Sequence, residues 1–577
     1  MTSDDAAKTL ADLGARYFVA QHTADPLNAT LLGVTGFDDQ LGDPSRTGSA
    51  RVVAEIGAIH DELLRLPDTT LDADGRVEHD VLQWLVEGTL ADVEHSLWES
   101  NASAAGYVSP QSLIFQAIPT APLPDEQAVT GWLTRLRGLP AYIDAIAARY
   151  QQAAADGRTP TRVGVRQALT QLEGHLARDL ADDVLLSASL PEGSTTARDT
   201  AAAIVAEQVR PTLRRLARVL NDSLLPVARD DEHVGLSWVP GGDEGYRAAV
   251  RRHTTTDLSP EQIHEIGLGT VAGLREEWAE VGGRALGITD VPEILATLRH
   301  DPGLRFETSA EIVQAVSDAL ARAEAVRGQW FPPFDITDCV VEEIDPVEVD
   351  NAALAYYRPP SADGTRPGAH CVLTTDPTNR FAYEYEALAF HESVPGHHLQ
   401  IASAQTLTWL PPHRRYIDAQ LSAYVEGWGL YSERLADDMG LYSSDRARLG
   451  MLSFDALRAC RLVVDTGMHA LGWSRERAAQ FMWDNTATTR ANVTNEIDRY
   501  IAWPGQALSY MIGRREIVRL RDRARAVLGS RFEARDFHGV VLSQGAVPLP
   551  VLGGLVDAWT NLADGVGRVG FRGGRAD

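Results

Sequence analysis

The chain has 577 residues, of which 44% are hydrophobic and 23% are charged, a composition typical of folded globular proteins and not of disordered chains. Its formal net charge of -27 argues against nucleic acid or an anionic membrane as a partner, because either would select for a basic surface. No apolar run reaches the roughly 18 residues of a membrane-spanning helix, and the N-terminus lacks a basic and then apolar leader. We therefore expect a soluble, cytoplasmic protein with no nucleic-acid partner and no membrane partner.

Helical periodicity dominates the first 255 residues. Apolar residues recur at intervals of three and four in four segments, namely 11–20, 81–97, 129–150 and 204–225. Near residue 255 we place an approximate boundary between two lobes. We therefore predict an N-terminal helical lobe over 1–255 and a catalytic lobe over 256–577. The second lobe opens with a helix start, because Ser259 is a typical N-cap and Gln262 stands at the reciprocal capping position.

Between residues 335 and 375 the pattern changes from helical to extended. Short β-branched or aromatic runs lie at 338–344, 353–359 and 369–375, and Asp363-Gly364 is a turn signal between the last two. We expect a small antiparallel β-sheet here. From Phe381 the helical pattern returns and continues almost to the C-terminus, so the fold class is predicted to be mainly α.

The segment FHESVPGHHLQ is similar to the zinc-binding helix motif H-E-x-x-H. In that motif two histidines four residues apart lie on one helix face, so both imidazoles can bind one metal ion. Here Pro395 stands four residues after His391, and the second histidine is displaced to His397 or His398. The cluster predicts metal binding more readily than packing, because Glu392 beside these histidines would be costly to bury without a partner.

The identity of the second histidine depends on how the helix continues. In an undistorted helix His398 would lie close to the face of His391, and His397 would point about 120° away. Pro395 lacks an N–H and its ring collides with the carbonyl group of residue 391, and Gly396 supplies a flexible joint, so we expect a break. If the break loops out two residues, His397 returns to the metal-facing position. We favour His397 and keep His398 as the alternative ligand.

Glu426 is the candidate third ligand. It follows His397 by 29 residues in the segment SAYVEGWGLYSERLA, which allows one helix to end and a second to run antiparallel past it. Two histidines and one glutamate would hold zinc and leave a fourth position for water. Glu392 would then take a proton from that water. The spacing also fits an ordinary helical glutamate, since Glu433 shares the face of Glu426.

Two later segments supply further candidates. In ACRLVVDTGMHALGW a carboxylate stands four residues before His469, a candidate catalytic residue, although a core histidine fits the spacing equally well. In RYIAWPGQALSYMIGRREI, Gln506 and Tyr510 lie four apart after Arg499. The Tyr510 hydroxyl is a suitable donor to an oxyanion, and Arg499 and Gln506 are candidate substrate-binding residues. Spacing alone is also explained by an amphipathic helix with a packed aromatic ring.

Taken together, the motifs HESVPGHHLQ, YVEGWGLYSERL, RLVVDTGMH, WPGQALSYMIG and AYYRPPSADGTRPG resemble the family catalogued as domain of unknown function 885, over essentially the whole chain. Members of that family are similar to helical zinc peptidases such as carboxypeptidase Taq and thimet oligopeptidase. Dipeptidyl peptidase III likewise carries an insertion before its second histidine. The resemblance implies a mainly α, zincin-like metallopeptidase fold with a small sheet beside the active-site helix and a deep cleft.

The resemblance also implies roles for single residues. It makes His391, His397 and Glu426 the zinc ligands, Glu392 the general base and Tyr510 a transition-state donor. By the same analogy the strand that contains Tyr356 and Tyr357 pairs with an extended substrate by edge addition. The sequence departs from the EGWALY pattern that is usual in this family by having Gly429. We expect this change to be minor for the metal ligands.

We therefore expect a zinc-dependent hydrolase that cleaves an amide bond in a short peptide or peptide-like metabolite by metal-activated water. Two alternatives stay open. A hydrolase of a small non-peptide amide or ester in specialised metabolism would share every metal residue. A metal-free binding or scaffold protein would result if the Pro-Gly insertion had abolished metal affinity.

Overall fold

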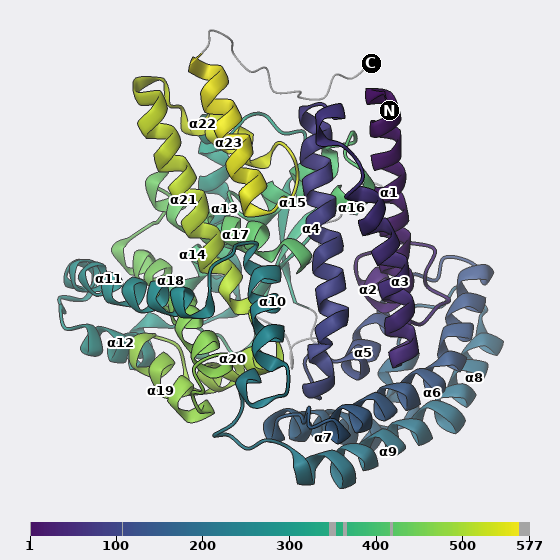
Figure 1. The fold of residues 1–577 in the computed structure, drawn as a ribbon. Coiled ribbons are helices and arrows are strands. Elements are labelled where there is room, and N and C mark those ends of the chain that lie inside the picture. The colour runs from purple at the N-terminus through teal and green to yellow at the C-terminus, as the bar shows by residue number, and fades with distance from the viewer. Residues whose placement is uncertain (1, 107, 345–353, 362–365, 416–418, 565–577) are drawn as a thin grey trace. The chain divides into compact units, whose positions relative to one another are not determined.

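The computed structural model of the protein describes residues 2–106, 108–344, 354–361, 366–415 and 419–564. These residues are mainly helical, which confirms the predicted class (Figure 1). Within them, no helix combines the length and the apolar character needed to cross a membrane.

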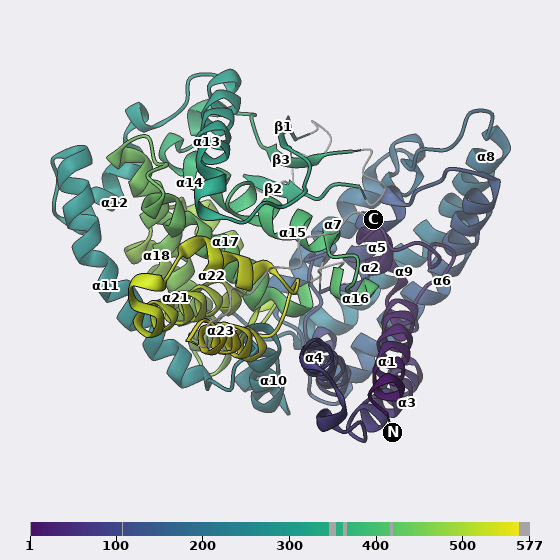
Figure 2. The same cartoon turned by 90° about the horizontal axis from the view of Figure 1, so that it is seen from above.

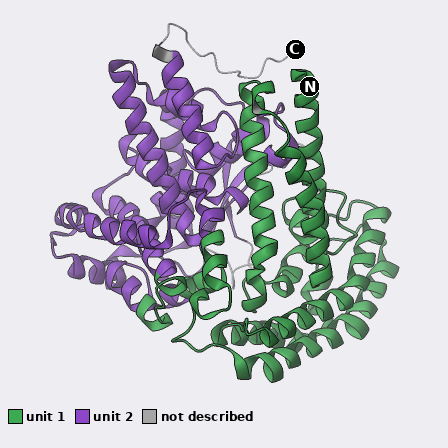
Figure 3. Ribbon diagram, in the orientation of Figure 1, with its two compact units in different colours: residues 1–249, 467–478, 495–504 green, residues 250–466, 479–494, 505–577 purple. Residues whose placement is uncertain are grey.

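The chain divides into two compact units, which Figure 3 colours separately. The first contains residues 1–249 with 467–478 and 495–504, and the second contains 250–466, 479–494 and 505–577. The division into an N-terminal lobe, 1–255, and a catalytic lobe, 256–577, stays a prediction. The two short segments that return to the first unit were not anticipated, because no local pattern marks them.

The first unit carries the α-helices of residues 1–254, the last of which continues into the second unit, and a hydrophobic core packs several of them together. In chain order these are α1 (Ser3–Ala24), α2 (Pro26–Leu31), α3 (Arg46–Leu63), α4 (Ala73–His95), α5 (Pro110–Thr120), α6 (Glu126–Ala155), α7 (Arg162–Ala177), α8 (Thr195–Ile204), α9 (Arg210–Arg218) and α10 (Gly242–Thr254). Figures 1 and 2 show α6, α7, α8 and α9 side by side. The helix predicted over 129–150 is α6, which buries Trp132, Leu136 and Ile143 in this core.

The second unit carries the remaining elements. They are α11 (Pro260–Leu286), α12 (Val291–His300), α13 (Ser309–Trp330), β1 (Cys339–Glu343), β2 (Ala355–Arg358), β3 (Gly368–Val372), α14 (Tyr385–Glu392), α15 (His397–Thr406), α16 (Pro412–Arg415), α17 (Ser422–Asp438) and α18 (Asp445–His469), and then α19 (Arg475–Asn485), α20 (Arg490–Ala502), α21 (Ser509–Leu528), α22 (Ala534–Leu542) and α23 (Leu549–Asp564). Parts of α18, α19 and α20 fall in the first unit. The predicted capping box of α11 is present, with Ser259 and Gln262 bonded reciprocally.

The small sheet is present but mixed, which corrects the antiparallel expectation. Its order is β1-β3-β2, with β1 parallel and β2 antiparallel to β3. Every residue of β3 is buried, as expected of a central strand with a partner on each edge. The predicted turn at Asp363-Gly364 lies outside the described residues. Figure 2 shows the strands beside α13 and α14, and β3 also contacts α15, so the sheet supports the helices that carry the histidine motif.

Candidate metal centre

The histidine motif forms two helices joined by a four-residue turn. α14 ends at Glu392 and α15 begins at His397, so the expected break occurs at Pro395 and Gly396. The Pro395 carbonyl oxygen accepts hydrogen bonds from Trp428 Nε1 at 2.9 Å and Ser432 Oγ at 3.2 Å, which ties the turn to α17. A Cβ atom at Gly396 would lie 1.8 Å from the carbonyl oxygen of His391, so this position requires glycine.

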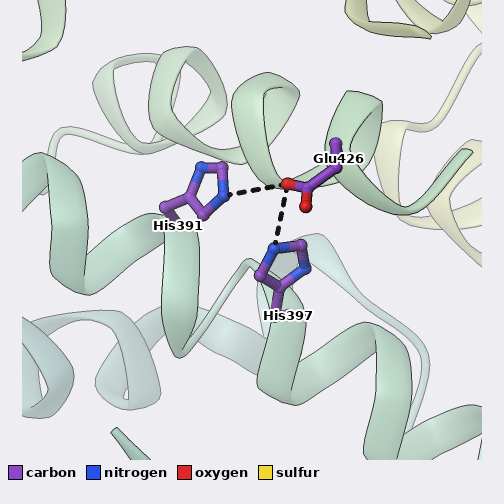
Figure 4. Close-up of side chains that lie close together, drawn as sticks. All are labelled: His391, His397 and Glu426. Carbon is purple, nitrogen blue, oxygen red and sulfur yellow. Dashed lines mark ion pairs between the residues drawn. The ribbon is translucent and has the colours of Figure 1, made fainter. Parts of the chain in front are cut away.

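Three side chains from α14, α15 and α17 converge at one point. Glu426 Oε2 lies 3.6 Å from His391 Nε2 and 3.5 Å from His397 Nε2, and the three atoms lie within 4.8 Å of one another. Figure 4 shows both imidazoles facing the carboxylate. Ligands about 2.1 Å from a tetrahedral zinc ion stand about 3.4 Å apart, so the two measured separations suit a shared metal ion.

The Nδ1 atom of each imidazole has its own partner. His391 Nδ1 donates to Glu433 Oε1 at 2.8 Å, and His397 Nδ1 donates to Gln400 Oε1 at 3.4 Å. These bonds fix the tautomers that leave each Nε2 lone pair facing Glu426, the arrangement that metal-binding histidines use. The sequence offered one signal for Glu433, its place on the face of Glu426, and none for Gln400.

The charges in the cluster favour a cation between the three side chains. Burial opposes ionisation of Glu426, but the two imidazoles outweigh it and hold its pKa well below the ordinary value. Burial likewise opposes charge on His391, but Glu426 and Glu433 raise its pKa to about 9. Glu426 and Glu433 thus stabilise positive charge on the His391 imidazole. A bound divalent ion would carry positive charge at the same position.

Glycines on α17 allow the close approach of its neighbours. Gly429 lies against the imidazole of His391, since a Cβ atom there would stand 2.6 Å from Cε1 and 2.7 Å from Nε2. Gly429 therefore lies directly against a candidate ligand, and the expectation that this departure is minor for the ligands stays a prediction. On another face of α17, a Cβ atom at Gly427 would stand 2.5 Å from Gly513 Cα, so α17 and α21 pack backbone to backbone.

Glu392 is the last residue of α14 and is half-buried beside the cluster. Burial raises the pKa of its carboxyl group above the ordinary value, against the lowering effect of His391 and His397. A carboxylate of this kind, next to a group of potential ligands, has the properties of a general base.

His398 lies outside this cluster. Its Nε2 donates to the carbonyl oxygen of Thr337 at 2.9 Å, and its Nδ1 accepts from the hydroxyl of Tyr357 at 3.0 Å. Burial lowers the pKa of His398 to about 4. The structure therefore gives His397 the position beside Glu426 and His398 a core position, which corrects the alternative that His398 is a ligand.

The tyrosines predicted to bind substrate lie on β2. Tyr356 faces Cys371 and Tyr357 faces His370 across the ladder to β3, and β2 is an edge strand of the described sheet. Tyr356 packs on the sheet core, and burial raises the pKa of Tyr357. An edge strand retains the backbone groups that strand addition needs, so the proposed pairing with a substrate stays a prediction.

Tyr510 and Gln506 also belong to the second unit. Gln506 is buried in the 3-10 turn just before α21, and its carbonyl oxygen accepts from Ser509 Oγ at 2.7 Å. Tyr510 is half-buried, with the guanidinium carbon of Arg461 4.4 Å and that of Arg458 5.8 Å from its ring centroid. The aromatic ring predicted on this helix thus has two guanidinium groups near it.

His469 and Arg499 belong to the first unit, and the structure corrects the catalytic role of His469. Its Nδ1 accepts from Leu236 N at 3.2 Å and its Nε2 donates to the Tyr500 carbonyl oxygen at 3.0 Å, so neither ring nitrogen is left for proton transfer. Burial lowers the pKa of His469 to about 4. The expected carboxylate partner, Asp465, accepts from the Gly505 N–H at 3.1 Å instead. Arg499 pairs with a glutamate one turn earlier on α20.

Comparisons with known proteins agree on family and fold. The family model described as "Bacterial protein of unknown function (DUF885)" matches residues 26–556. The crystal structure of a protein described as a "putative lipoprotein" from Colwellia psychrerythraea is 26% identical, with a TM-score of 0.87 over 97% of this chain and 100% of that chain. A "putative lipoprotein of unknown function" from Shewanella oneidensis, 18% identical, has the same fold, with a TM-score of 0.74 over 95% of this chain and 99% of that chain. No curated protein matches the sequence.

Proposed function

We propose that this chain, which belongs to the DUF885 family of bacterial proteins of unknown function, is a zinc-dependent hydrolase that cleaves an amide bond in a short peptide or peptide-like metabolite. The observation that carries the proposal is the convergence of His391, His397 and Glu426 within 4.8 Å, with Glu392 beside them. The proposal includes the predicted similarity to helical zinc peptidases, which implies a zincin-like fold with a deep cleft.

The residues present fit a zinc site. Two imidazoles and one carboxylate are a common catalytic donor set, and each imidazole already has the Nδ1 partner that such ligands require. Zinc bound there would polarise the scissile carbonyl group and lower the pKa of water. Glu392 would accept a proton from the attacking water at its carboxylate and return it to the leaving nitrogen. Tyr510 stays the proposed donor to the oxyanion.

Metal content is the first test. The protein is purified without added metal, and zinc per chain is measured by mass spectrometry for the wild type and for the His391→Ala and His397→Ala variants. We expect about one zinc in the wild type and none in either variant, because each imidazole supplies one of three ligands. His300→Ala, which removes an exposed histidine from α12, is the matched control and should keep zinc. A wild type that takes up no zinc even when it is offered would support the binding-protein alternative.

Turnover tests the assigned base. Glu392→Gln should keep zinc and lower the hydrolysis of a peptide panel by about 100- to 10,000-fold, since general-base catalysis contributes that much. Full activity in Glu392→Gln would refute the mechanism. Cleavage of simple esters or non-peptide amides, with no cleavage of peptides, would identify the alternative hydrolase.

The location is part of the same proposal. We propose a cytoplasmic enzyme that acts on small molecules without a nucleic-acid or membrane partner. The two structural relatives are described as putative lipoproteins, so fractionation of the native bacterium is the direct measurement. Recovery of the chain with the membrane fraction would contradict the cytoplasmic location.

A further inference from the structure

The central strand of the sheet is bonded to the turn that ends α14. His370 Nδ1 on β3 and Ser393 Oγ are hydrogen-bonded at 3.0 Å, and both residues are 0% exposed. Ser393 is the residue that follows Glu392, the last residue of α14. This bond therefore joins the sheet to the position next to the proposed base.

Ser393 is held through each of its polar groups. Its N–H donates to the Ala389 carbonyl oxygen at 2.9 Å, and its own carbonyl oxygen accepts from the His398 N–H at 3.1 Å. Those two bonds stay within the histidine motif, and the hydroxyl group is the one that reaches the sheet. The hydroxyl also lies beside the thiol of Cys339 on β1. Burial raises the pKa of that thiol to about 12, so it is an uncharged and weak hydrogen-bond partner.

β3 gives His370 a fixed place from which to hold the turn. His370 faces Val341 of β1 and Tyr357 of β2, so a shift of its backbone would disturb the pairing on both sides. Its Nε2 atom is buried without a hydrogen-bond partner among the residues that the structure describes. Burial of such a nitrogen costs free energy, and an aliphatic side chain of similar size would fill the space without that cost. The bond made by Nδ1, and not packing alone, therefore accounts for an imidazole at this position.

Glu392 needs such support because of its place at the end of a helix. Helix ends open more readily than helix centres, since fewer backbone bonds hold them. A general base must keep its carboxylate within hydrogen-bond reach of the water that it deprotonates, and a misplacement of about 1 Å lowers the rate by about 100-fold. The residue beside Glu392 is tied to the rigid strand through His370.

We propose that His370 is a positioning residue, which holds the end of α14 through Ser393 and so keeps Glu392 in place. This inference rests on the proposed function, in which Glu392 is the base. His370 acts through Ser393 and not on the substrate. Its loss should therefore lower the turnover number kcat and leave KM and the zinc content unchanged.

Kinetics of the zinc-loaded protein are the first test. His370→Leu keeps most of the side-chain volume and removes one partner of the bond, and Ser393→Ala removes the other. Each should lower kcat by about 10- to 100-fold at unchanged KM, the effect of a small misplacement. His370→Asn, whose Oδ1 or Nδ2 atom stands where Nδ1 of histidine stands, should recover most of the rate. Unchanged kcat in both His370→Leu and Ser393→Ala, or a loss expressed only in KM, would overturn the positioning role.

A double variant separates one shared bond from two independent effects. His370→Leu combined with Ser393→Ala should have about the kcat of the slower single variant, because both changes remove the same interaction. Losses that add would contradict the proposal. Ser403→Ala is the matched control, since it removes a buried hydroxyl group that bonds to the Leu399 carbonyl oxygen within α15. It should keep the kcat of the wild type.

Hydrogen–deuterium exchange keeps the two proposals separable. We expect the amide hydrogens of residues 391–399 in the zinc-loaded protein to exchange faster in His370→Leu and Ser393→Ala than in the wild type or in Ser403→Ala. Unchanged exchange would overturn the tie between sheet and turn, whether or not the protein hydrolyses a substrate. Faster exchange with full kcat would refute the positioning role and leave the hydrolase proposal standing. A wild type that binds zinc and hydrolyses nothing would refute the hydrolase proposal and, with it, the catalytic role of the tie.

Discussion

At the scale of single residues, the candidate centre depends on groups that do not face the metal position. Glu433 is completely buried, and it accepts the Nδ1 hydrogen of His391 through Oε1, while its Oε2 is buried without a hydrogen-bond partner in the described part of the chain. Its charge is therefore compensated chiefly by one imidazole. A carboxylate in this position orients the ring and raises the basicity of the nitrogen that binds the metal.

Removal of the Glu433 charge should weaken metal binding. Glu433→Gln keeps an oxygen that can accept from His391 Nδ1 but loses the negative charge, so we expect zinc affinity to fall by about 10-fold and up to about 100-fold. Competition with a chromophoric chelator measures the dissociation constant. Asp438→Asn, an exposed position on α17, should leave the affinity unchanged. Equal affinities in Glu433→Gln and wild type would show that Glu433 only fills space.

At the scale of elements, the turn between α14 and α15 places the two histidines. Its carbonyl oxygen at Pro395 is held by Trp428 and Ser432 of α17, the same helix that supplies Glu426. The turn and the third ligand are thus fixed by one helix. α17 is itself held to α18 through the pair of Arg434 with Asp455, which also bonds to α21.

A methyl group in this turn should disturb both stability and metal binding. A Cβ atom at Gly396 would lie 1.8 Å from the His391 carbonyl oxygen and 2.4 Å from that of Phe390, and both are backbone atoms that cannot move alone. We expect Gly396→Ala to lower the free energy of unfolding by about 1–3 kcal/mol, as overpacking does, and to reduce zinc content. Urea denaturation and metal analysis measure the two effects.

The control for this substitution is a glycine with free space. Gly273 lies within α11, and a Cβ atom there would meet nothing within 4 Å. Gly273→Ala should leave stability unchanged or raise it by up to about 1 kcal/mol, because alanine favours helix. Equal stability of the Gly396→Ala and Gly273→Ala variants would contradict the steric argument.

At the scale of the whole molecule, buried neutral histidines link folding to pH. His538 donates from Nδ1 to the Trp330 carbonyl oxygen at 2.8 Å and accepts at Nε2 from Tyr431 at 2.9 Å. His469 is bonded at both nitrogens in the same neutral form. Burial lowers the pKa of each to about 4, well below the value of about 6.5 in an unfolded chain.

Stability should therefore fall as the pH is lowered from about 6.5 toward 4. In this window the unfolded chain binds a proton at each of the two histidines and the folded chain does not, so the free energy of unfolding rises with pH and is lost on acidification. Urea denaturation at pH 7 and at pH 5, with chelator present at both, measures the difference. His538→Gln should reduce the slope of the free energy of unfolding against pH by the equivalent of about one bound proton. Equal stability of the wild type at the two pH values would contradict the assignment.

Local features were predictable from the sequence because they depend on neighbours in the chain. The periodicity over 129–150 gave the helix that became α6, and the reciprocal cap at Ser259 is set by residues within one turn. The break after Glu392 follows from the sterics of proline and glycine, which also favour the return of His397 to the face of His391 over the alternative, His398.

Tertiary structure decided what depends on distant partners. The order of the strands, the bonds that occupy His469 and the bond between Glu433 and His391 all depend on residues far apart in sequence. The sequence by itself determined that the chain is mainly helical and where its candidate metal ligands lie. Which groups support those ligands was decided only by the packing of α14, α15, α17 and α18, because a side chain acquires its hydrogen-bond partner, or lacks one, only when the helices meet.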